Sequence, residues 1–262
     1  MKLTGQTAIV TGGGRGLGRA IAEQLARLGA HVVVASRNAP ELDEVVLAIK
    51  RERGRALAYA ADVADERQVQ ELVFNTERWV GPATILVNNA GVVDPVGPLA
   101  RADSTVWLRH IAINVGGVFL ATRAVLPGML ERGYGRIVNI SSHAAARPSA
   151  GRTAYSASKA AVEQLTRSLA LELDGTGVTV CAFRPGSIET RMQERIRRAS
   201  PEDYPDVEEH REKKRTGQVG DPKDRARLIA YLVSEAAVRN GQILEPDEAL
   251  EREAAAAMGA PV

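Results

Sequence analysis

The sequence is poor in the residues that build disulfide-bonded, metal-binding and nucleic-acid-binding proteins. Its 262 residues include one cysteine, Cys181, which excludes an internal disulfide and a cysteine-rich zinc site, and we expect this thiol to be buried. The four histidines never stand in a metal-ligand spacing such as HExxH, so no metal is expected. Aromatic residues make up 4%, and 34 basic against 32 acidic residues leave a net charge of +2 without a basic block. The composition therefore predicts no nucleic-acid partner.

Long hydrophobic runs are missing as well. The longest stretch free of Lys, Arg, Asp and Glu covers residues 79–93, and its 15 residues include Pro82 and two asparagines. Such a stretch is too short and too polar to span a bilayer. The first residues do not have the layout of a signal peptide. We therefore expect a cytoplasmic protein without a membrane segment.

What the sequence does contain is an alternation of short apolar runs with longer segments of helical period. Most of the runs are apolar throughout, as expected of strands that are covered on both faces of a parallel sheet. No linker or repeat divides the chain. Residues 1–262 are therefore predicted to form one domain, an α/β doubly wound (Rossmann) fold with helices on both faces of a mostly parallel seven-stranded sheet. The predicted strands are residues 7–11, 31–36, 56–60, 85–88, 136–141, 178–183 and 242–244.

A glycine-rich turn, TGGGRGLG, follows the first predicted strand and begins at Thr11. The common dinucleotide pattern GxGxxG does not fit, because a series that starts at Gly12 would have to end on Leu17, and no P-loop lysine follows. The spacing TGxxxGxG has the same physical use. Its glycines let the backbone approach a pyrophosphate, which then rests on the free N–H groups of a helix N-terminus. The alternative is a merely flexible turn, but the position before a helix favours a dinucleotide site.

Three motifs occur in the order and at the spacing of a known enzyme family. They are the glycine turn, Asn88-Asn89-Ala90-Gly91 after the fourth strand, and Tyr155-Ser156-Ala157-Ser158-Lys159. With them the chain resembles the short-chain dehydrogenase/reductase family, in particular NADP-preferring members similar to 3-oxoacyl reductases, from about residue 3 to residue 244. The resemblance implies an oxidoreductase that transfers a hydride between NADP(H) and a small-molecule ketone or secondary alcohol.

The resemblance also implies roles for individual residues. Tyr155 would donate or accept the proton, Lys159 would support it, and Ser142, which lies 13 residues before Tyr155, would bind the carbonyl oxygen. Asn114 would hold a helix backbone and a water that links Lys159 to solvent, and Asn88 would tie the central strands together. The implied cofactor-binding residues are Gly12, Gly14, Arg15, Gly16, Leu17, Gly18, Ser36, Arg37, Asp62, Val63, Asn89, Ala90, Gly91, Tyr155, Lys159, Pro185, Gly186, Ile188 and Thr190.

The residues themselves fit this chemistry. Tyr155 and Lys159 are four positions apart, which places them on one face of a helix. Val162, Leu169 and Leu173 share that face, so it should point inward. A tyrosine that titrates near pH ~10 can donate a proton to an alkoxide, and a nearby ammonium lowers its pKa, which allows the reverse reaction.

Each of these residues also has an ordinary structural explanation. Alone, they could be a core tyrosine, a boundary lysine, a loop cap at Ser142 and a helix cap at Asn114. Their combination with a dinucleotide turn favours catalysis. The alternative function is a catalytically silent, dinucleotide-sensing binding protein on the same fold. Such a sensor has no reason to keep a proton donor beside an activating lysine.

The end of the second predicted strand favours NADP(H) over NAD(H). An NAD-specific site usually has a carboxylate there, whereas this strand ends in Ser36 and Arg37, and the first acid is Glu41. Arg37 and Arg15 could clamp a 2′-phosphate between them. The alternative is that both arginines only face solvent. Asp62 would bind the adenine amino group of either cofactor.

Residues 187–220 are predicted to form a lid over the substrate. Their eight basic and eight acidic residues balance, which favours a solvated helical face over an anion-binding one. His143 and Arg152 are close to the catalytic residues along the chain, but we expect both to be loop residues that face water. Apolar contacts with a ligand would come from Ile188, Met192, Ile196, Tyr204 and Val207.

The C-terminus departs from the family, because the glycine pair that commonly ends the last strand is absent. Residues 244–262 thus form a divergent tail, which could contact a neighbouring subunit or be disordered. The resemblance implies a homodimer or a homotetramer, both equally compatible with this sequence, through the helices around residues 107–126 and 153–173. Apolar residues that could supply these surfaces are Leu108, Ile111, Val115, Phe119 and Leu165.

Overall fold

A parallel sheet of seven strands runs through the computed structural model, which describes residues 1–259. The strand order β3-β2-β1-β4-β5-β6-β7 places the reversal of chain direction between β1 and β4, and every neighbouring pair is parallel. The predicted doubly wound fold is confirmed, with strand ends shifted by two residues at most. The strands are β1 (Thr7–Thr11), β2 (His31–Ser36), β3 (Arg55–Ala60), β4 (Ala83–Asn88), β5 (Gly135–Ile140), β6 (Val178–Phe183) and β7 (Ile243–Leu244).

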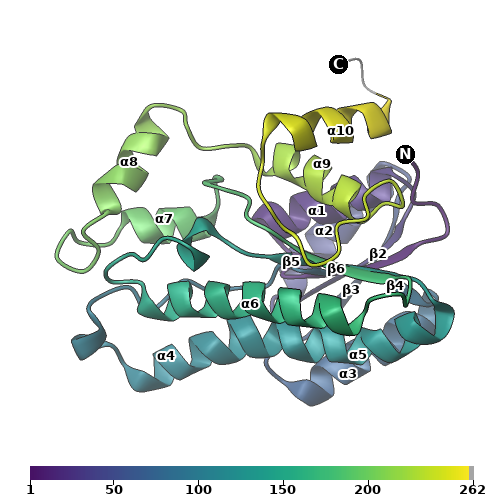
Figure 1. Ribbon diagram of the computed structural model, residues 1–262, viewed down its shortest axis with the longest axis horizontal. Coiled ribbons are helices and arrows are strands. Elements are labelled where there is room, and N and C mark those ends of the chain that lie inside the picture. Colours follow the sequence, from purple (N-terminus) through teal and green to yellow (C-terminus); the bar gives the residue numbers. More distant parts are fainter. Residues whose placement is uncertain (260–262) are drawn as a thin grey trace.

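Helices cover both faces of this sheet (Figure 1). One layer packs α1, α2, α9 and α10 against the sheet, and the other packs α3, α5 and α6. Short 3₁₀ turns lie at Leu99–Arg101 and His143–Ala145. The helices are α1 (Gly16–Arg27), α2 (Ala39–Arg51), α3 (Glu66–Trp79), α4 (Ser104–Ile111), α5 (Gly117–Arg132), α6 (Thr153–Glu172), α7 (Arg191–Arg197), α8 (Val207–Arg215), α9 (Pro222–Leu232) and α10 (Glu248–Met258).

The apolar patterns explain these layers. Ile21 and Leu25, four positions apart on α1, are fully buried against the sheet, and Gly29 follows the helix with a φ of 99° that favours glycine. Strands β1 and β5 are buried along their whole length, because a helix layer covers each of their faces. Cys181 of β6 lies in the core, where burial raises the pKa of its thiol to about 12. The thiol is therefore structural, as expected.

Ser104–Arg132 is one long apolar helical stretch, in which a π-helical turn at Ala112–Gly116 joins α4 to α5. Within residues 1–259, this is the stretch that is long and apolar enough, by length and composition, to cross a membrane. In the fold, Ala121, Val125 and Met129 pack against the sheet. Core packing thus accounts for the apolar face of this stretch.

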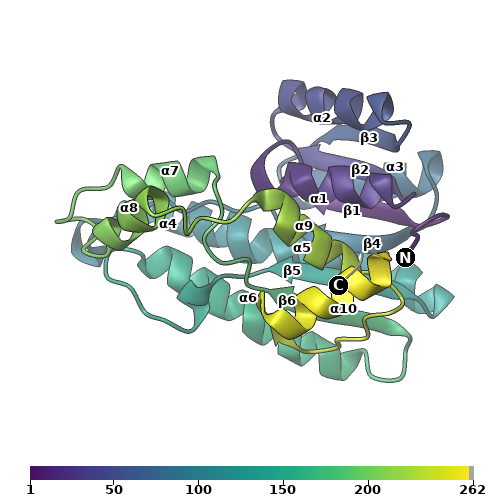
Figure 2. The ribbon, with the colours of Figure 1, turned by 90° about the horizontal axis from the view of Figure 1, so that it is seen from above.

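The segment 187–220 extends beyond the carboxyl ends of the strands with α7 and α8 (Figure 2). The charged side chains of α8 are mostly exposed, which agrees with the predicted solvated face. On the inner side, Ile196, Tyr204 and Val207 are buried in a small cluster that also contains Tyr155. The prediction that Val207 contacts a ligand is wrong, because this side chain is fully buried and does not reach the cavity described below.

The C-terminal tail folds back on its own chain. Asp247 caps α10 by accepting a hydrogen bond from the backbone N–H of Leu250, and Leu250 and Ala254 are buried in the core layer of α1 and α9. The amino group of Met1 donates to the carbonyl oxygen of Ala257 at 2.6 Å. Of the two alternatives for the tail, disorder is therefore wrong for residues 248–258, which form a packed helix, and a contact with a neighbouring subunit stays a prediction. The rest of that prediction, residues 260–262, lies outside the described residues.

Candidate active site

A cavity of about 1730 Å³ lies at the carboxyl ends of the central strands. In an open α/β sheet, ligands bind at this edge, where the strand order reverses. A single small ligand occupies roughly 300–1,000 Å³, so this cavity has room for a dinucleotide together with a substrate. All of the predicted cofactor-binding residues line it, as do Ser142, Tyr155 and Lys159. Asn114 lies behind the wall of the cavity.

The glycine turn is built for close approach to the backbone. Helix α1 begins at Gly16, and its N-cap residue, Arg15, makes no side-chain cap, so the first N–H groups of the helix have no side-chain partner. A Cβ atom on Gly18 would lie 2.2 Å from the carbonyl oxygen of Gly12, so no larger residue fits there without moving the turn. Free N–H groups at a helix N-terminus, next to an open glycine backbone, fit the pyrophosphate of a dinucleotide.

The Asn88–Gly91 segment holds the turn in place. Thr11 Oγ1 accepts hydrogen bonds from the backbone N–H groups of Asn89 and Ala90, both at 3.1 Å. The Asn89 side chain donates to the carbonyl oxygens of Thr11 and Gly12 at 3.0 and 3.2 Å. One residue earlier, Asn88 Nδ2 donates to Asn139 Oδ1 at 2.9 Å and so ties β4 to β5. The supporting role expected for this segment agrees with these contacts.

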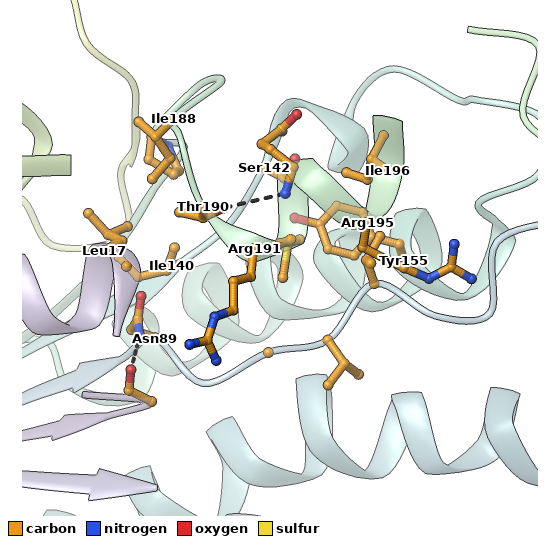
Figure 3. Close-up of a pocket in the computed structure, with 18 of the residues that line it drawn as sticks. Leu17, Asn89, Ile140, Ser142, Tyr155, Ile188, Thr190, Arg191, Arg195 and Ile196 are labelled. Carbon is orange, nitrogen blue, oxygen red and sulfur yellow. Dashed lines mark hydrogen bonds between the residues drawn. The ribbon is translucent and has the colours of Figure 1, made fainter. Parts of the chain in front are cut away.

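Ser142, Tyr155 and Lys159 converge on one wall of the cavity. Tyr155 and Lys159 are four residues apart on α6 and are 7% and 5% exposed, so the helix face points inward as predicted. Ser142 follows β5 and lies next to Tyr155 (Figure 3). Its Oγ accepts a hydrogen bond from the N–H of Ala144 at 3.2 Å, and its own O–H group is left for the Tyr155 oxygen or for a ligand. Ser142 thus combines the loop cap with a position suited to bind a carbonyl oxygen.

Burial shifts the proton equilibria of this wall. Burial raises the pKa of Tyr155 above its ordinary value, although the positive charge of Arg152 and the Ser142 hydroxyl oppose the shift. Burial lowers the pKa of Lys159 to about 8. Its Nζ donates to the carbonyl oxygen of Ile140 at 2.7 Å and lies 5.8 Å from the centroid of the Tyr155 ring. At neutral pH the site therefore has a protonated tyrosine beside a lysine that is mostly charged.

Asn114 sits in the π-helical turn between α4 and α5, a type of irregularity that is frequent at functional sites. Its side chain accepts a hydrogen bond from the N–H of Val92 at 2.8 Å and donates to the carbonyl oxygen of the same residue at 2.9 Å. It also contacts the buried His110, whose Nδ1 is 2.7 Å from the Asp94 carbonyl oxygen. Asn114 therefore holds the loop after β4, whereas the resemblance implied that it holds a helix backbone.

A carboxylate, that of Glu41, lies at the predicted adenosine end of the cavity. In the sequence it comes four residues after Arg37, and we did not expect it to contact this end. Glu41, in the first turn of α2, lies 3.5 Å from Arg15 and 2.7 Å from Arg191 of α7. Arg15 is therefore paired, while Arg37 is exposed and makes no ion pair within residues 1–259. Asp62 accepts a hydrogen bond from the N–H of Ala64 at 3.0 Å and also pairs with Arg109.

His143 and Arg152, which were both expected to face water, differ in their exposure. His143 is exposed and pairs with Glu245 at 2.6 Å, in agreement with a residue that faces water. The same expectation for Arg152 is wrong, because Arg152 is only 6% exposed. It is buried between the rings of Tyr155 and Tyr204, and Tyr204 lies 52 residues away, between α7 and α8. No local pattern could have revealed this contact.

A buried ion pair that the sequence analysis missed supports the floor of the site. Arg184, just before Pro185-Gly186, binds Glu163 of α6 through two hydrogen bonds of 2.7 and 2.8 Å. The Ser141 hydroxyl donates to the same carboxylate at 2.7 Å. A signal was available, because Glu163 lies one helical turn after Lys159 on the same inward face. This network joins the segments after β5 and β6 to α6.

Comparison with known proteins decides the family. Residues 6–201 match the short chain dehydrogenase family. The chain belongs to this family. Proteins similar to it include dehydrogenases and reductases, and in this short chain dehydrogenase the glycine turn and the Tyr155–Lys159 pair line the same cavity.

Individual relatives agree. A short chain dehydrogenase of Pseudocercospora fijiensis is 42% identical over 193 residues, which cover 73% of this chain and only 62% of that protein. The 3-oxoacyl-(acyl-carrier-protein) reductase of Pseudomonas aeruginosa is 32% identical over 241 residues, which cover 90% of this chain and 93% of that reductase. A solved structure from Beutenbergia cavernae, assigned as an NAD(P)-dependent gluconate 5-dehydrogenase with NADP at low occupancy, has a TM-score of 0.84 and 33% identity over 93% of this chain and 96% of its own.

Proposed function

We propose that this short chain dehydrogenase interconverts a ketone and a secondary alcohol with a nicotinamide dinucleotide. The observation that carries the proposal is the buried wall formed by Ser142, Tyr155 and Lys159, at the end of a cavity that begins at the glycine turn. A dinucleotide-sensing protein would not need this set. The proposal includes the catalytic and cofactor-binding roles that the family resemblance implied for individual residues.

The residues of this wall divide the work. Bound nicotinamide supplies or accepts the hydride. Ser142 donates a hydrogen bond from its hydroxyl to the carbonyl oxygen and so orients the substrate, while its Oγ accepts from the N–H of Ala144. Tyr155, kept protonated by burial, donates its proton to the oxygen as negative charge develops there. Lys159 donates one hydrogen bond to the carbonyl oxygen of Ile140. Its other N–H groups would hold a ribose hydroxyl of the bound cofactor, and its ammonium would supply the proton that Tyr155 loses.

Turnover on a panel of carbonyl compounds tests this function. We expect the purified protein to consume NADPH or NADH, followed by the loss of absorbance of the reduced nicotinamide, with at least one ketone of the panel. The reverse reaction should be seen with the corresponding secondary alcohol and the oxidised cofactor. Binding of the cofactor without turnover of any carbonyl or alcohol would favour the sensor instead.

We also propose that the enzyme prefers NADP(H). The support is Arg37 at the end of β2, which is exposed, borders the cavity and has no carboxylate partner within residues 1–259. A guanidinium in this position can bind a 2′-phosphate through two parallel hydrogen bonds. Arg15 supports Arg37 less than the sequence implied, because Glu41 lies beside it.

Arg37→Asp should shift the ratio of kcat/KM for NADPH over NADH toward NADH by about tenfold to a hundredfold, because a charge-assisted contact is replaced by a repulsive carboxylate. The exposed Arg67→Asp on α3, away from the cavity, is the control and should leave the ratio unchanged. Glu41→Gln should raise the preference for NADPH, because it frees Arg15. A wild-type enzyme that uses NADH as well as NADPH would contradict the preference.

The assembly state is a further part of the proposal: we expect a homodimer or a homotetramer formed through the layer of α4, α5 and α6 (Figure 1). Leu108 and Phe119 are 63% and 49% exposed in this layer. Apolar side chains this exposed are common at subunit interfaces.

A cytoplasmic location stays a prediction from the sequence.

Light scattering should therefore give a mass of at least twice the 28.0 kDa of one chain at micromolar concentration. Replacing both Leu108 and Phe119 with Glu should lower the mass to that of one chain. The matched control is Leu47→Glu on α2, which removes a side chain of similar exposure, 54%, from the other helix layer and should not change the mass. A 28.0 kDa particle for the wild type would overturn the proposal.

A further inference from the structure

Arg152 is a cation buried directly beside the proposed proton donor. Its guanidinium carbon lies 4.9 Å from the centroid of the Tyr155 ring and 5.2 Å from that of the Tyr204 ring. The side chain lines the substrate end of the cavity, although only 6% of the residue is exposed. A buried guanidinium normally needs an anion or several hydrogen bonds to offset the water that it loses.

The protein supplies few of those partners. Arg152 Nη1 donates one hydrogen bond, to the Tyr204 hydroxyl at 3.1 Å. The fully buried Nε has no hydrogen-bond partner. Within residues 1–259, no carboxylate forms an ion pair with Arg152. The neighbouring cavity arginines Arg184, Arg191 and Arg195 are all paired, with Glu163, Glu41 and Asp94.

The hydrogen-bond network behind Tyr204 does not provide a negative charge. Because Tyr204 accepts from Arg152, its own proton goes to His210 Nε2 at 2.9 Å, and His210 Nδ1 then donates to Gln193 Oε1 at 3.0 Å. Burial, followed by the positive charges of Arg152 and Lys213, lowers the pKa of His210 to about 4, so the ring is neutral at pH 7. The network is uncharged from end to end.

The lid carboxylates close to His210 are engaged elsewhere. Asp206 accepts a hydrogen bond from the Ser149 hydroxyl at 2.8 Å, and Glu209 pairs with Lys213. Both are exposed, so their charges are weakened by solvent. Within residues 1–259, Arg152 thus lines the substrate end of the cavity without a carboxylate in direct contact with its guanidinium.

We propose that Arg152 binds a carboxylate of the substrate, and that the enzyme therefore acts on oxo acids and the corresponding hydroxy acids. This proposal rests on the carbonyl–alcohol function proposed above. The Arg152 guanidinium packs on the ring of Tyr155, and the Tyr155 hydroxyl is the group that meets the substrate carbonyl oxygen. A substrate that contacts both residues therefore has its carboxylate only a few bonds from its carbonyl carbon. The Nη N–H groups that do not bind Tyr204 are available to the two oxygens of a carboxylate.

A purely structural role for Arg152 makes a different prediction. An arginine that only supports the Tyr155 and Tyr204 rings would affect charged and neutral substrates alike. An arginine that binds a carboxylate changes their ratio. The informative quantity is therefore kcat/KM for an oxo acid divided by kcat/KM for its methyl ester, since the ester keeps the carbonyl and the shape but has no charge.

The experiment measures this ratio with NADPH for a series of 2-oxo and 3-oxo carboxylates and their methyl esters. We expect the wild type to prefer the acid of the best pair by about tenfold to a hundredfold. Arg152→Met should abolish the preference, mainly by raising KM of the acid. Any loss of kcat that follows from the missing charge beside Tyr155 affects the acid and the ester alike, so the ratio is the readout. Arg152→Lys keeps the charge without the fork and should retain part of the preference. Arg147→Met is the matched control, because Arg147 is an exposed arginine of the same cavity that also makes no ion pair within residues 1–259, and it should leave the ratio unchanged.

The outcomes separate this inference from the function on which it rests. Wild-type turnover of neutral ketones or esters without a preference for acids overturns the role of Arg152 and leaves the carbonyl–alcohol function intact. An unchanged ratio in Arg152→Met, or an equal loss in Arg147→Met, overturns it too. Absence of turnover on every carbonyl contradicts the function itself. Measurements of NADPH affinity and thermal unfolding show whether Arg152→Met is misfolded. If it is, the acid-to-ester ratio of Arg152→Lys is the test: a ratio below that of the wild type supports the inference, and an unchanged ratio overturns it.

Discussion

Tyr155→Phe should lower kcat by about 10²–10⁴-fold, because this change removes the proton donor and keeps the buried ring. Packing against Lys159 and Arg152 depends on the ring, so folding and cofactor affinity should stay close to the wild type. Steady-state kinetics on an established ketone, together with a fluorescence titration of NADPH, measures both quantities. The two readouts separate lost chemistry from lost structure.

Tyr59→Phe is the matched control for this variant. It removes a hydroxyl that accepts a hydrogen bond from Asn75 at 3.0 Å, on β3 and away from the cavity, and it should leave kcat unchanged. If Tyr155→Phe keeps most of its activity, another group donates the proton and our assignment of Tyr155 is wrong.

Lys159→Met should affect both kcat and cofactor binding. We expect the NADPH dissociation constant to rise by about tenfold to a hundredfold, because the ammonium can donate charge-assisted hydrogen bonds beyond the one that it makes to Ile140. The kcat should fall as well, since Tyr155 loses its neighbouring charge. An unchanged NADPH affinity would contradict the contact with the cofactor.

The pH dependence of stability provides a second readout for the same lysine. The pKa of Lys159 is about 8 in the folded protein and 10.5 ordinarily, so between these values the unfolded chain binds more protons than the folded one. The unfolding free energy of the free enzyme should therefore rise with pH through this window, relative to Lys159→Met. The relative gain from pH 7 to 9.5 should be about 2 kcal/mol, measured by denaturant unfolding of both proteins. A pH-independent difference between them would mean that Lys159 is not held in this environment.

The fold was predictable because its signals are local. Strands that are buried on both faces are apolar throughout, and α1 repeats its apolar residues at helical spacing, so each element could be located from a few neighbouring residues. The candidate site was predictable for the same reason. Its main residues lie at the carboxyl ends of strands or four positions apart on one helix, and parallel strands bring those ends together.

The contacts that sequence reasoning missed join side chains that are distant along the chain. Arg152 is buried because Tyr204, between α7 and α8, covers it, and Arg15 is paired because α2 brings Glu41 back over the glycine turn. The C-terminal helix shows the same limit, since its burial depends on α9 and on the N-terminus. Helical or strand periodicity carries no information about such pairs.

The most direct test of the central claim follows the hydride itself. NADPH that carries deuterium at the transferable C4 position is incubated with the wild-type enzyme and a ketone that it reduces, and the alcohol is analysed by mass spectrometry. We predict that each alcohol molecule carries one deuterium on its carbinol carbon, and that Tyr155→Phe forms the same product at a rate lower by about 10²–10⁴-fold. Alcohol without deuterium, or cofactor binding without any alcohol, would contradict the account.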